Sequence, residues 1–180
     1  MTDEKFAYNQ FQDLDVVSMN CINMLMDESE IVWKLLYYND RDAWNKSNLT
    51  KAQKRSMIYG GEDDETKYRV FMDIGQNDAW TQESCVIRIS PHSAIGKNRT
   101  VGILTVSFEV FAHYKINTLS NYKTRVEMIT KEFFRIFNGA RIGGLGQLYF
   151  DGMANPTDRM IQASQIPFKG KQVFMSVNAA

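Results

Sequence analysis

The second half of the chain sets a long run of alternating residues directly before a pattern with helical spacing. From Val101 to His113 (VGILTVSFEVFAH) the residues alternate in polarity, which is typical of a half-buried β-strand. Between Ser120 and Asn138 the spacing changes to that of an amphipathic helix, with a stripe made of Tyr122, Val126, Ile129, Phe133 and Ile136. Because each pattern has one apolar face to bury, we expect a two-layer α+β fold with the helix packed across a sheet.

More strands are expected on either side of this unit. On the N-terminal side, Lys67–Ile74 alternates, and a second run over Cys85–Ile89 ends at Pro91. His92–Thr100 then has the polar, locally basic composition of a hairpin connection, which favours a mostly antiparallel sheet. The strands expected on the C-terminal side are Leu148–Phe150, Arg159–Ile166 and Lys171–Val177.

The long strand should present two different faces. Its core-facing residues are predicted to be Leu104, Val106, Phe108 and Val110. The other face, from Ile103 to Phe111, mixes apolar, hydroxyl and charged side chains. We therefore expect that second face to be solvated or to pair with a neighbour.

The first third of the chain is predicted to be helical. Apolar residues recur at helical spacing over Asp13–Met26, and Glu30–Tyr38 follows as a short helix rich in aromatic residues. A polar loop around Trp44 comes next. The small helix expected over Thr50–Ile58 begins with the Thr-x-x-Gln spacing of a capping box.

Length and charge limit the class of protein. With 180 residues the chain can bury one core, so we expect a single α+β domain, with a helical part (1–66) that includes the inserted loop and a sheet-plus-helix core (67–180). Lys+Arg and Asp+Glu both number 21, so the cationic surplus that nucleic-acid binding needs is missing, although a local basic patch stays open. No apolar run reaches the ~18 residues of a membrane span, and the N-terminus (MTDEKFAYNQ) does not resemble a signal peptide.

No pattern in the sequence predicts catalysis, a cofactor or a metal. Cys21 and Cys85 lie in apolar settings and are expected to be reduced core residues, while two histidines, His92 and His113, are too few for a zinc cluster. The glycine-rich segment Gly143–Gly146 invites comparison with a phosphate loop, but it follows a helix and opens a strand, the reverse of the order that such a loop needs. We interpret it as a tight helix-to-strand turn, and we do not expect an enzyme.

From Val101 to Gly152 the chain resembles the core of the tail-terminator and tail-completion proteins of tailed bacteriophages. The features that carry the resemblance are the alternating strand, the connection INTLSNYKTR, the amphipathic helix VEMITKEFFRIFNG and the turn ARIGGLGQLYFDG, in that order. The pattern extends over about Lys67–Val177, whereas residues 27–66 depart from the compact family plan. The resemblance implies a structural virion protein of the phage neck, assembled in the host cytoplasm, without catalytic residues or cofactors.

The resemblance also implies a homo-oligomeric ring, a hexamer or a dodecamer, that terminates the tail or joins it to portal, head-completion or tail-tube proteins. DNA would pass through the lumen of such a ring without sequence-specific binding. By this analogy, subunit contacts are expected in the Trp44 loop, the hairpin connection and the C-terminal strand. The residues implied as subunit interface are Trp44, His92, Lys97, Arg99 and Phe174.

Three alternatives stay open from the sequence. The first is a different neck component, a head-completion (stopper or adaptor) ring. The second is a small ligand- or nucleic-acid-binding domain that uses the sheet face around Phe111 and Tyr149. The third is a hydrolase whose activity depends on His113.

Overall fold

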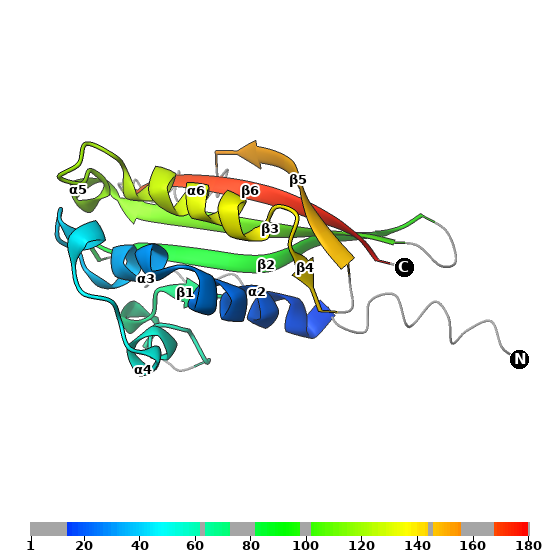
Figure 1. Ribbon diagram of the computed structural model, residues 1–180, viewed down its shortest axis with the longest axis horizontal. Helices are drawn as coiled ribbons and strands as arrows, with labels where there is room; N and C mark the ends of the chain where they lie inside the picture. Colours follow the sequence, from blue (N-terminus) through cyan, green and yellow to red (C-terminus); the bar gives the residue numbers. More distant parts are fainter. Residues whose placement is uncertain are drawn as a thin grey trace, which may run out of the picture.

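The structure, a computed structural model, describes residues 14–61, 64–72, 82–97, 102–143, 146–155 and 168–179 and has an α+β architecture (Figure 1). Its helices are α2 (Leu14–Glu28), α3 (Glu30–Tyr37), η2 (Ala43–Asn45), α4 (Lys51–Arg55), η3 (Glu65–Lys67), α5 (Tyr114–Asn117) and α6 (Arg125–Phe137). Its strands are β1 (Val70–Phe71), β2 (Cys85–Gly96), β3 (Gly102–His113), β4 (Arg141–Ile142), β5 (Gly146–Ala154) and β6 (Phe168–Ala179). Among the described helices, none combines the length and the apolar character that crossing a bilayer requires.

The described strands form one sheet in the order β1-β2-β3-β6-β5-β4. Each neighbouring pair is antiparallel except β1 and β2, which are parallel. The centre of the sheet is the pair of β3 and β6, whose register runs without a break from Gly102 opposite Ala179 to His113 opposite Phe168. The prediction of an α+β fold with a mostly antiparallel sheet is therefore confirmed.

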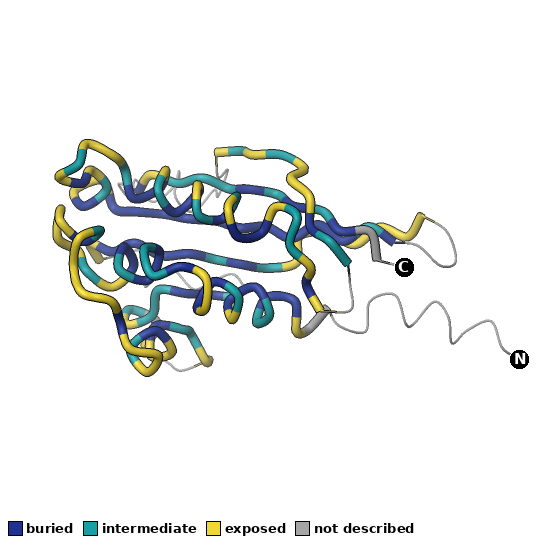
Figure 2. The backbone as a smooth tube through the Cα atoms, viewed as in Figure 1, coloured by how far each residue is buried: buried dark blue, intermediate teal, exposed yellow. Residues whose placement is uncertain are grey.

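Helices α2, α3 and α6 cover one face of the sheet, and the main core lies between these helices and the strands (Figure 1). Figure 2 shows that buried residues follow the central strands, whereas exposed residues gather in the loops at the ends. On α6, the rings of Phe133 and Phe137 lie 5.6 Å and 4.5 Å from the ring of Phe108, measured between centroids. The residues of β3 that enter this core are the four that its alternation predicts: Leu104, Val106, Phe108 and Val110.

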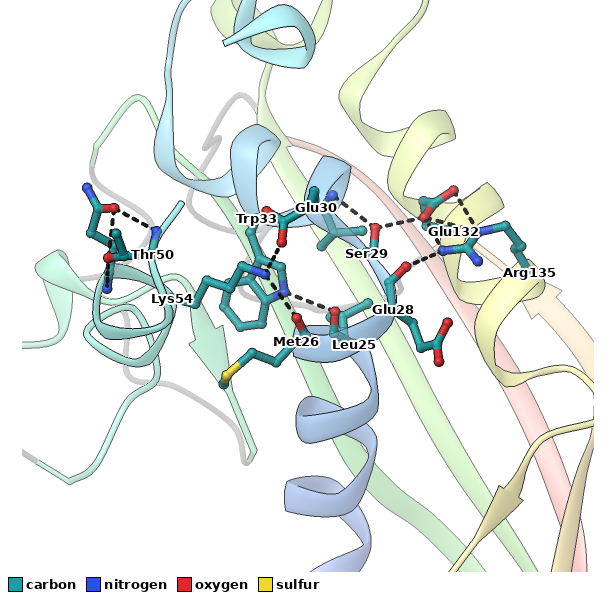
Figure 3. Close-up of polar contacts among 12 residues, drawn as sticks. Leu25, Met26, Glu28, Ser29, Glu30, Trp33, Thr50, Lys54, Glu132 and Arg135 are labelled. Atoms are coloured by element: carbon teal, nitrogen blue, oxygen red, sulfur yellow. Dashed lines mark hydrogen bonds and ion pairs between the residues drawn. The ribbon is translucent and has the colours of Figure 1, made fainter. Parts of the chain in front are cut away.

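Polar contacts also hold the corner between α2 and α3 (Figure 3). Ser29, the N-cap of α3, donates a hydrogen bond of 2.7 Å to Glu132 of α6. Lys54 of α4 lies buried against the same corner, where it donates to the Met26 carbonyl at 2.9 Å and to Glu30 at 2.6 Å. Side-chain hydrogen bonds therefore tie α4 to α2 and α3, and α3 to α6, in addition to the shared core.

The helix predicted over Ser120–Asn138 begins later, at Arg125. Thr124 and Glu127 form a capping box at its start, and this reciprocal pair fixes the beginning of α6. The residues before Thr124 form α5 and a turn, so Tyr122 lies outside the helix and its placement on the apolar stripe is wrong. The other four members of the predicted stripe are buried: Val126, Ile129, Phe133 and Ile136.

Strand β2 does not end at Pro91, as the sequence predicts, but continues to Gly96. Its pairing with β3 is irregular between Pro91 and Ser93, so His92 belongs to the strand and not to a hairpin loop. Proline lacks an amide donor and is tolerated at sheet edges and bulges. The described part of β1 pairs with β2 only at Ile87 and Arg88, so Pro91 stands at such an edge.

The remaining strands also differ from their predicted bounds. Within the range Lys67–Ile74, where a strand is expected, only β1 (Val70–Phe71) is a strand among the described residues. Lys67 is instead the last residue of the 3-10 turn η3. Strands β5 and β6 are longer than predicted, because pairing with the neighbouring strands extends them beyond the alternating runs. The strand expected over Arg159–Ile166 lies outside the described residues.

Candidate functional site

The second face of the sheet, opposite α2, α3 and α6, consists of the alternate residues of the central strands. Thr105, Ser107 and Glu109 of β3 lie on this face and are buried. Of the two expected states of this face, solvated or paired with a neighbour, the solvated one does not apply to the middle of β3. The neighbours of these three residues on the second face are Arg88 and Ser90 of β2, and Gln172, Phe174 and Ser176 of β6.

Glu109 is the centre of a buried polar cluster on the second face. It forms an ion pair with Arg88, which is its direct partner in the register of β2 and β3. From the other side, Gln172 donates to Glu109 Oε1 at 2.6 Å and to the Ser107 hydroxyl at 3.0 Å. Ser107 itself donates to the same carboxylate oxygen at 3.2 Å. A carboxylate that is 3% exposed is thus surrounded by a cation and two hydrogen-bond donors, the partners that a buried charge needs.

A second polar row crosses the same face toward the hairpin of β2 and β3. The hydroxyls of Thr105 and Ser176 lie 3.0 Å apart, and Ser176 donates to Asp151 of β5 at 2.6 Å. Asp151 is at a register irregularity, between Phe150 and Gly152, in the pairing of β5 with β6. The bulge therefore aims an edge carboxylate at the second face.

Two of the residues implied as subunit interface meet on the second face. The ring centroids of His92 and Phe174 are 4.8 Å apart, although the residues belong to β2 and β6 and β3 lies between them. Ser107 of β3 is the direct partner of Phe174, and its small side chain leaves room for this contact. His92 is exposed and Phe174 is half-buried, so the pair forms an accessible ring-stacked patch.

The other residues implied as interface lie apart from this pair. Lys97 is exposed directly after β2, and Arg99 lies outside the described residues. Trp44 is at the opposite end of the sheet, in η2, where its ring is half-buried against the core and its Nε1 donates to the Ser120 hydroxyl at 3.1 Å. The structure thus brings His92 and Phe174 together but separates Trp44 from them, and Trp44 braces the loop that contains Ser120.

Two strands have an outer edge that is open over part of its length among the described residues. On β2, β1 covers only the first part. On β5, β4 and the residues before it hydrogen-bond to the edge as far as Phe150, so the open part is residues 151–154. Sequence reasoning missed the β5 edge, because the alternation ends at Phe150 and only pairing with β6 shows that the strand continues. The exposed apolar residues along these edges are Tyr149, Phe150 and Met153 on β5, and Ala94 and Ile95 on β2.

The end of the sheet near α5 is organised by a buried arginine. Arg125 is fully buried at the start of α6, and burial lowers the pKa of its guanidinium. Backbone carbonyls take the place of water around this cation. At distances of 2.6 to 2.7 Å it donates to the carbonyls of Leu35, Tyr38, Asp40 and Ile116.

A tight turn at this end presents Tyr122 to solvent. Tyr122 has a φ of 61°, the only positive value at a non-glycine residue within the described ranges, and such a conformation costs about 1–2 kcal/mol. The turn is closed by a hydrogen bond of 2.9 Å from the Leu119 amide to the Lys123 carbonyl. Ser120 connects it to the loop of η2, because its amide donates to the Arg41 carbonyl and its hydroxyl to Asp42. No sequence pattern signals this strained position.

An open groove of about 520 Å³ lies beside this turn, between the start of α6 and the first residues of β6. Its apolar floor is formed by buried residues: Phe111, Val126 and Phe168. Its rim is polar and is formed by Asn117, Thr124, Glu127, Asn155, Lys169 and Lys171. Phe111, which the second alternative from the sequence names, is thus almost fully buried at the floor of this groove.

The titratable residues singled out in the sequence are engaged or buried. His113 Nδ1 accepts a hydrogen bond of 3.3 Å from the Lys115 amide and so caps α5, and burial lowers the pKa of this histidine. Burial raises the pKa of both thiols, that of Cys85 to about 12, which keeps Cys21 and Cys85 protonated at neutral pH. The described residues contain no group of three or more His, Cys, Asp or Glu arranged to hold a metal ion.

Comparison with known proteins places this arrangement within a family. The family model described as YomW matches residues 29–173, from the N-cap of α3 into β6. The match therefore includes the Arg125 cluster, the Tyr122 turn, both sheet edges and most of the second face. No curated protein matches the chain.

Proposed function

The chain belongs to the YomW family of phage-associated proteins, and from this premise we propose that it is a structural protein of the phage neck. Copies of the chain form a ring in the virion that terminates the tail or joins it to the portal or head-completion rings. The observation that carries the proposal is that the outer edges of β2, after Arg88, and of β5, after Phe150, have no described strand beside them, and that both strands expose apolar side chains. Monomeric proteins normally protect such edges.

The directions of the strands suit a contact between unlike edges. Strands β2, β3, β6 and β5 alternate in direction, so β5 runs opposite to β2. When β5 of one subunit lies beside β2 of an equally oriented copy, the two strands are antiparallel and the alternation of the sheet continues. A contact between two different surfaces is heterologous, and heterologous contacts produce a ring when the rotation between subunits closes.

Apolar residues match on both faces of such a contact. Phe150 and Met153 are on the helix side of β5, as Ala94 is on the helix side of β2. Tyr149 and Ile95 are on the second face of their strands. Burial of these side chains, each about half-exposed or more, supplies the hydrophobic contribution that a lasting subunit contact needs.

Both edges also carry features that limit uncontrolled pairing. Pro91 interrupts the donors of β2, and the bulge at Asp151 bends β5 and adds a charge. A continuous ladder of main-chain hydrogen bonds between copies is therefore disfavoured, and contact depends on matching side chains. This selectivity supports a defined ring over open-ended strand addition.

A head-completion (stopper or adaptor) ring remains the second candidate, because the same two edges support any ring of the neck. The two differ in position along the virion. Gold-labelled antibody against the chain, applied to virions and to purified tails, distinguishes them. Label on the end of free tails supports a tail terminator, and label that stays with DNA-filled heads supports a head-completion ring.

The ring itself is tested by native mass spectrometry of the purified chain over a range of concentrations. We expect a discrete hexamer or dodecamer that Tyr149→Lys converts to smaller species, because the substitution places a charge in the β5 edge. Tyr37→Lys is the matched control, since Tyr37 is a similarly exposed tyrosine on α3 and should leave the ring intact. A wild-type chain that stays monomeric throughout contradicts a self-assembling ring.

A further inference from the structure

Tyr122 is presented to solvent in a way that ordinary surface tyrosines are not. Its side chain is 92% exposed, and its backbone is held in the left-handed region that favours glycine. Backbone strain of this kind persists only where surrounding structure enforces it, and it is concentrated at functional positions. An exposed aromatic ring on a strained turn therefore indicates a contact that the isolated chain does not make.

The structure around Tyr122 fixes the backbone from which its ring projects. Thr118 and Thr124 form a β-bridge across the base of the turn. Asn121 accepts a hydrogen bond of 3.1 Å from the Lys123 amide within the turn. From outside, Trp44 and the loop of η2 hold Ser120. A rigid aromatic side chain loses little entropy on binding, which is the property of an anchor residue at a protein interface.

The chain also has a receptor for such an anchor, the groove beside the turn. The groove offers an apolar floor to an aromatic ring and polar rim groups to a phenol hydroxyl, as ligand-binding clefts of its size commonly do. Thr124 belongs to both features, since it bridges the base of the turn and lines the groove. Anchor and receptor therefore lie next to each other at one end of the molecule.

We propose that Tyr122 of one copy binds in the groove of a second copy, and that the second copy returns the same contact. A surface that carries both an anchor and its receptor is self-complementary, and a two-fold axis satisfies both contacts at once. In the structure Tyr122 does not occupy the groove of its own chain, because its side chain is exposed.

The charges at this end are of both signs, which suits contact with a second copy of the chain. Asp40 pairs with Lys46 and Glu83 with Lys115, so much of the charge is neutralised within the chain. Lys123 follows Tyr122 and is exposed, while the rim of the groove has Glu127 beside Lys169 and Lys171. In the reciprocal contact, Lys123 of each copy approaches Glu127 of the other, which adds charge complementarity.

This two-fold contact goes beyond the proposed ring and uses a different surface. The ring contact joins the β2 and β5 edges, whereas the two-fold contact lies at the end formed by α5 and the start of α6. Added to a cyclic arrangement, a two-fold contact pairs two rings and doubles the number of subunits. Each contact can therefore be lost while the other persists.

The test uses two variants that each remove one half of the contact. Tyr122→Gly removes the anchor and relieves the backbone strain, so the turn is retained. Asn155→Trp fills the groove from its rim, where Asn155 is exposed. Self-association is measured by sedimentation equilibrium, in the wild-type background and in Tyr149→Lys, which removes the proposed ring contact. We expect each variant to weaken the two-fold association at least tenfold, and Tyr37→Ser, the control, to leave it unchanged.

Mixing the two variants gives the decisive result. A Tyr122→Gly chain keeps its groove and an Asn155→Trp chain keeps its anchor, so one of the two contacts is restored in a mixed pair and none in either variant alone. A 1:1 heterodimer supports the inference. Failure of the mixture to associate overturns it, as does a wild-type association that Tyr122→Gly leaves unchanged, or a Tyr149→Lys chain that is monomeric at all concentrations. A ring that survives Tyr122→Gly with its subunit number unchanged overturns the two-fold contact and leaves the neck proposal standing.

Discussion

The two faces of β3 are buried to a similar degree by different physical means. On the helix side, Val106, Phe108 and Val110 enter the main core. On the second face, Ser107 and Glu109 are also buried, but their burial depends on an ion pair and hydrogen bonds. Apolar packing is non-directional and tolerates rearrangement, whereas a buried charge needs particular partners in particular positions. The helix side of β3 thus contributes mainly to stability, whereas its second face determines which residues lie opposite one another.

The polar side chains of the second face define the register between β3 and β6. Thr105 is directly opposite its hydrogen-bond partner Ser176, and Glu109 is directly opposite Gln172. A shift of one residue would turn each β3 side chain to the other face and break both contacts. Such a shift would also bring the apolar side chains out of the core. The broken polar pairs would add a further cost in free energy, because buried polar groups would lose their hydrogen bonds.

The largest effect is expected on the helix side. Phe108→Ala removes a fully buried ring that packs on Phe133 and Phe137, and it should lower the free energy of unfolding by about 4 kcal/mol. Phe108→Leu keeps most of the volume and should cost only about 1 kcal/mol. Urea unfolding measures both values from the shift in midpoint. If Phe108→Ala costs no more than about 1 kcal/mol, burial at this position contributes little and the helix side is not the main stabilising face.

The second face should respond to the loss of a partner more than to the loss of volume. Glu109→Ala leaves Arg88 without its buried counter-ion and should cost about 3 kcal/mol. Replacing both partners, in Arg88→Met with Glu109→Leu, removes the unpaired charge and should recover most of this loss. Thermal unfolding of Arg88→Met, Glu109→Leu and the double variant forms a double-mutant cycle. A double variant as unstable as Glu109→Ala contradicts the assignment of this cost to an unpaired Arg88.

The helix side of this comparison could be predicted from the sequence, and the second face could not. The alternation in β3 and the stripe on α6 both report burial on one side, and local capping signals such as Thr50 with Gln53 identify where a helix begins. Residues such as Ser107 and Glu109 have side chains that are usually solvated, so their mixed pattern does not decide whether the face is solvated or paired with a neighbour. Their burial depends on Arg88 and Gln172, which are distant in sequence.

The candidate site shows the same limit. The family resemblance implies Trp44 and Phe174 as interface residues, but not that Trp44 braces Ser120 or that Phe174 meets His92 across β3. Tyr122 was assigned to the helix because its spacing fits the stripe, and only the capping box at Arg125 shows that the helix begins after it. Backbone strain and contacts between distant strands are tertiary properties, which periodicity does not report.

The smallest effect should be a pH dependence at the end of the second face. His113 is mostly buried there, and burial, aided by Lys115 and opposed by Glu83, lowers its pKa from the usual 6.5. Between the folded and unfolded pKa values the unfolded chain binds more protons, so the stability of the fold should fall as the pH drops below about 6.5. His113→Asn keeps a side chain that can cap α5 but does not titrate, and it should lose this slope.

Urea midpoints of the wild type and His113→Asn, measured from about pH 8 to about pH 5, give the difference between the two slopes. Other groups titrate equally in both chains, so only the difference is assigned to His113. Phe108→Leu serves as the control, because a substitution on the helix side changes stability without changing a titratable group. Parallel curves for wild type and His113→Asn contradict a burial-lowered pKa at this position. If the urea midpoint of His113→Asn changes less with pH than that of the wild type, the two faces also differ in pH dependence. The second face then contributes stability that depends on the protonation state of His113.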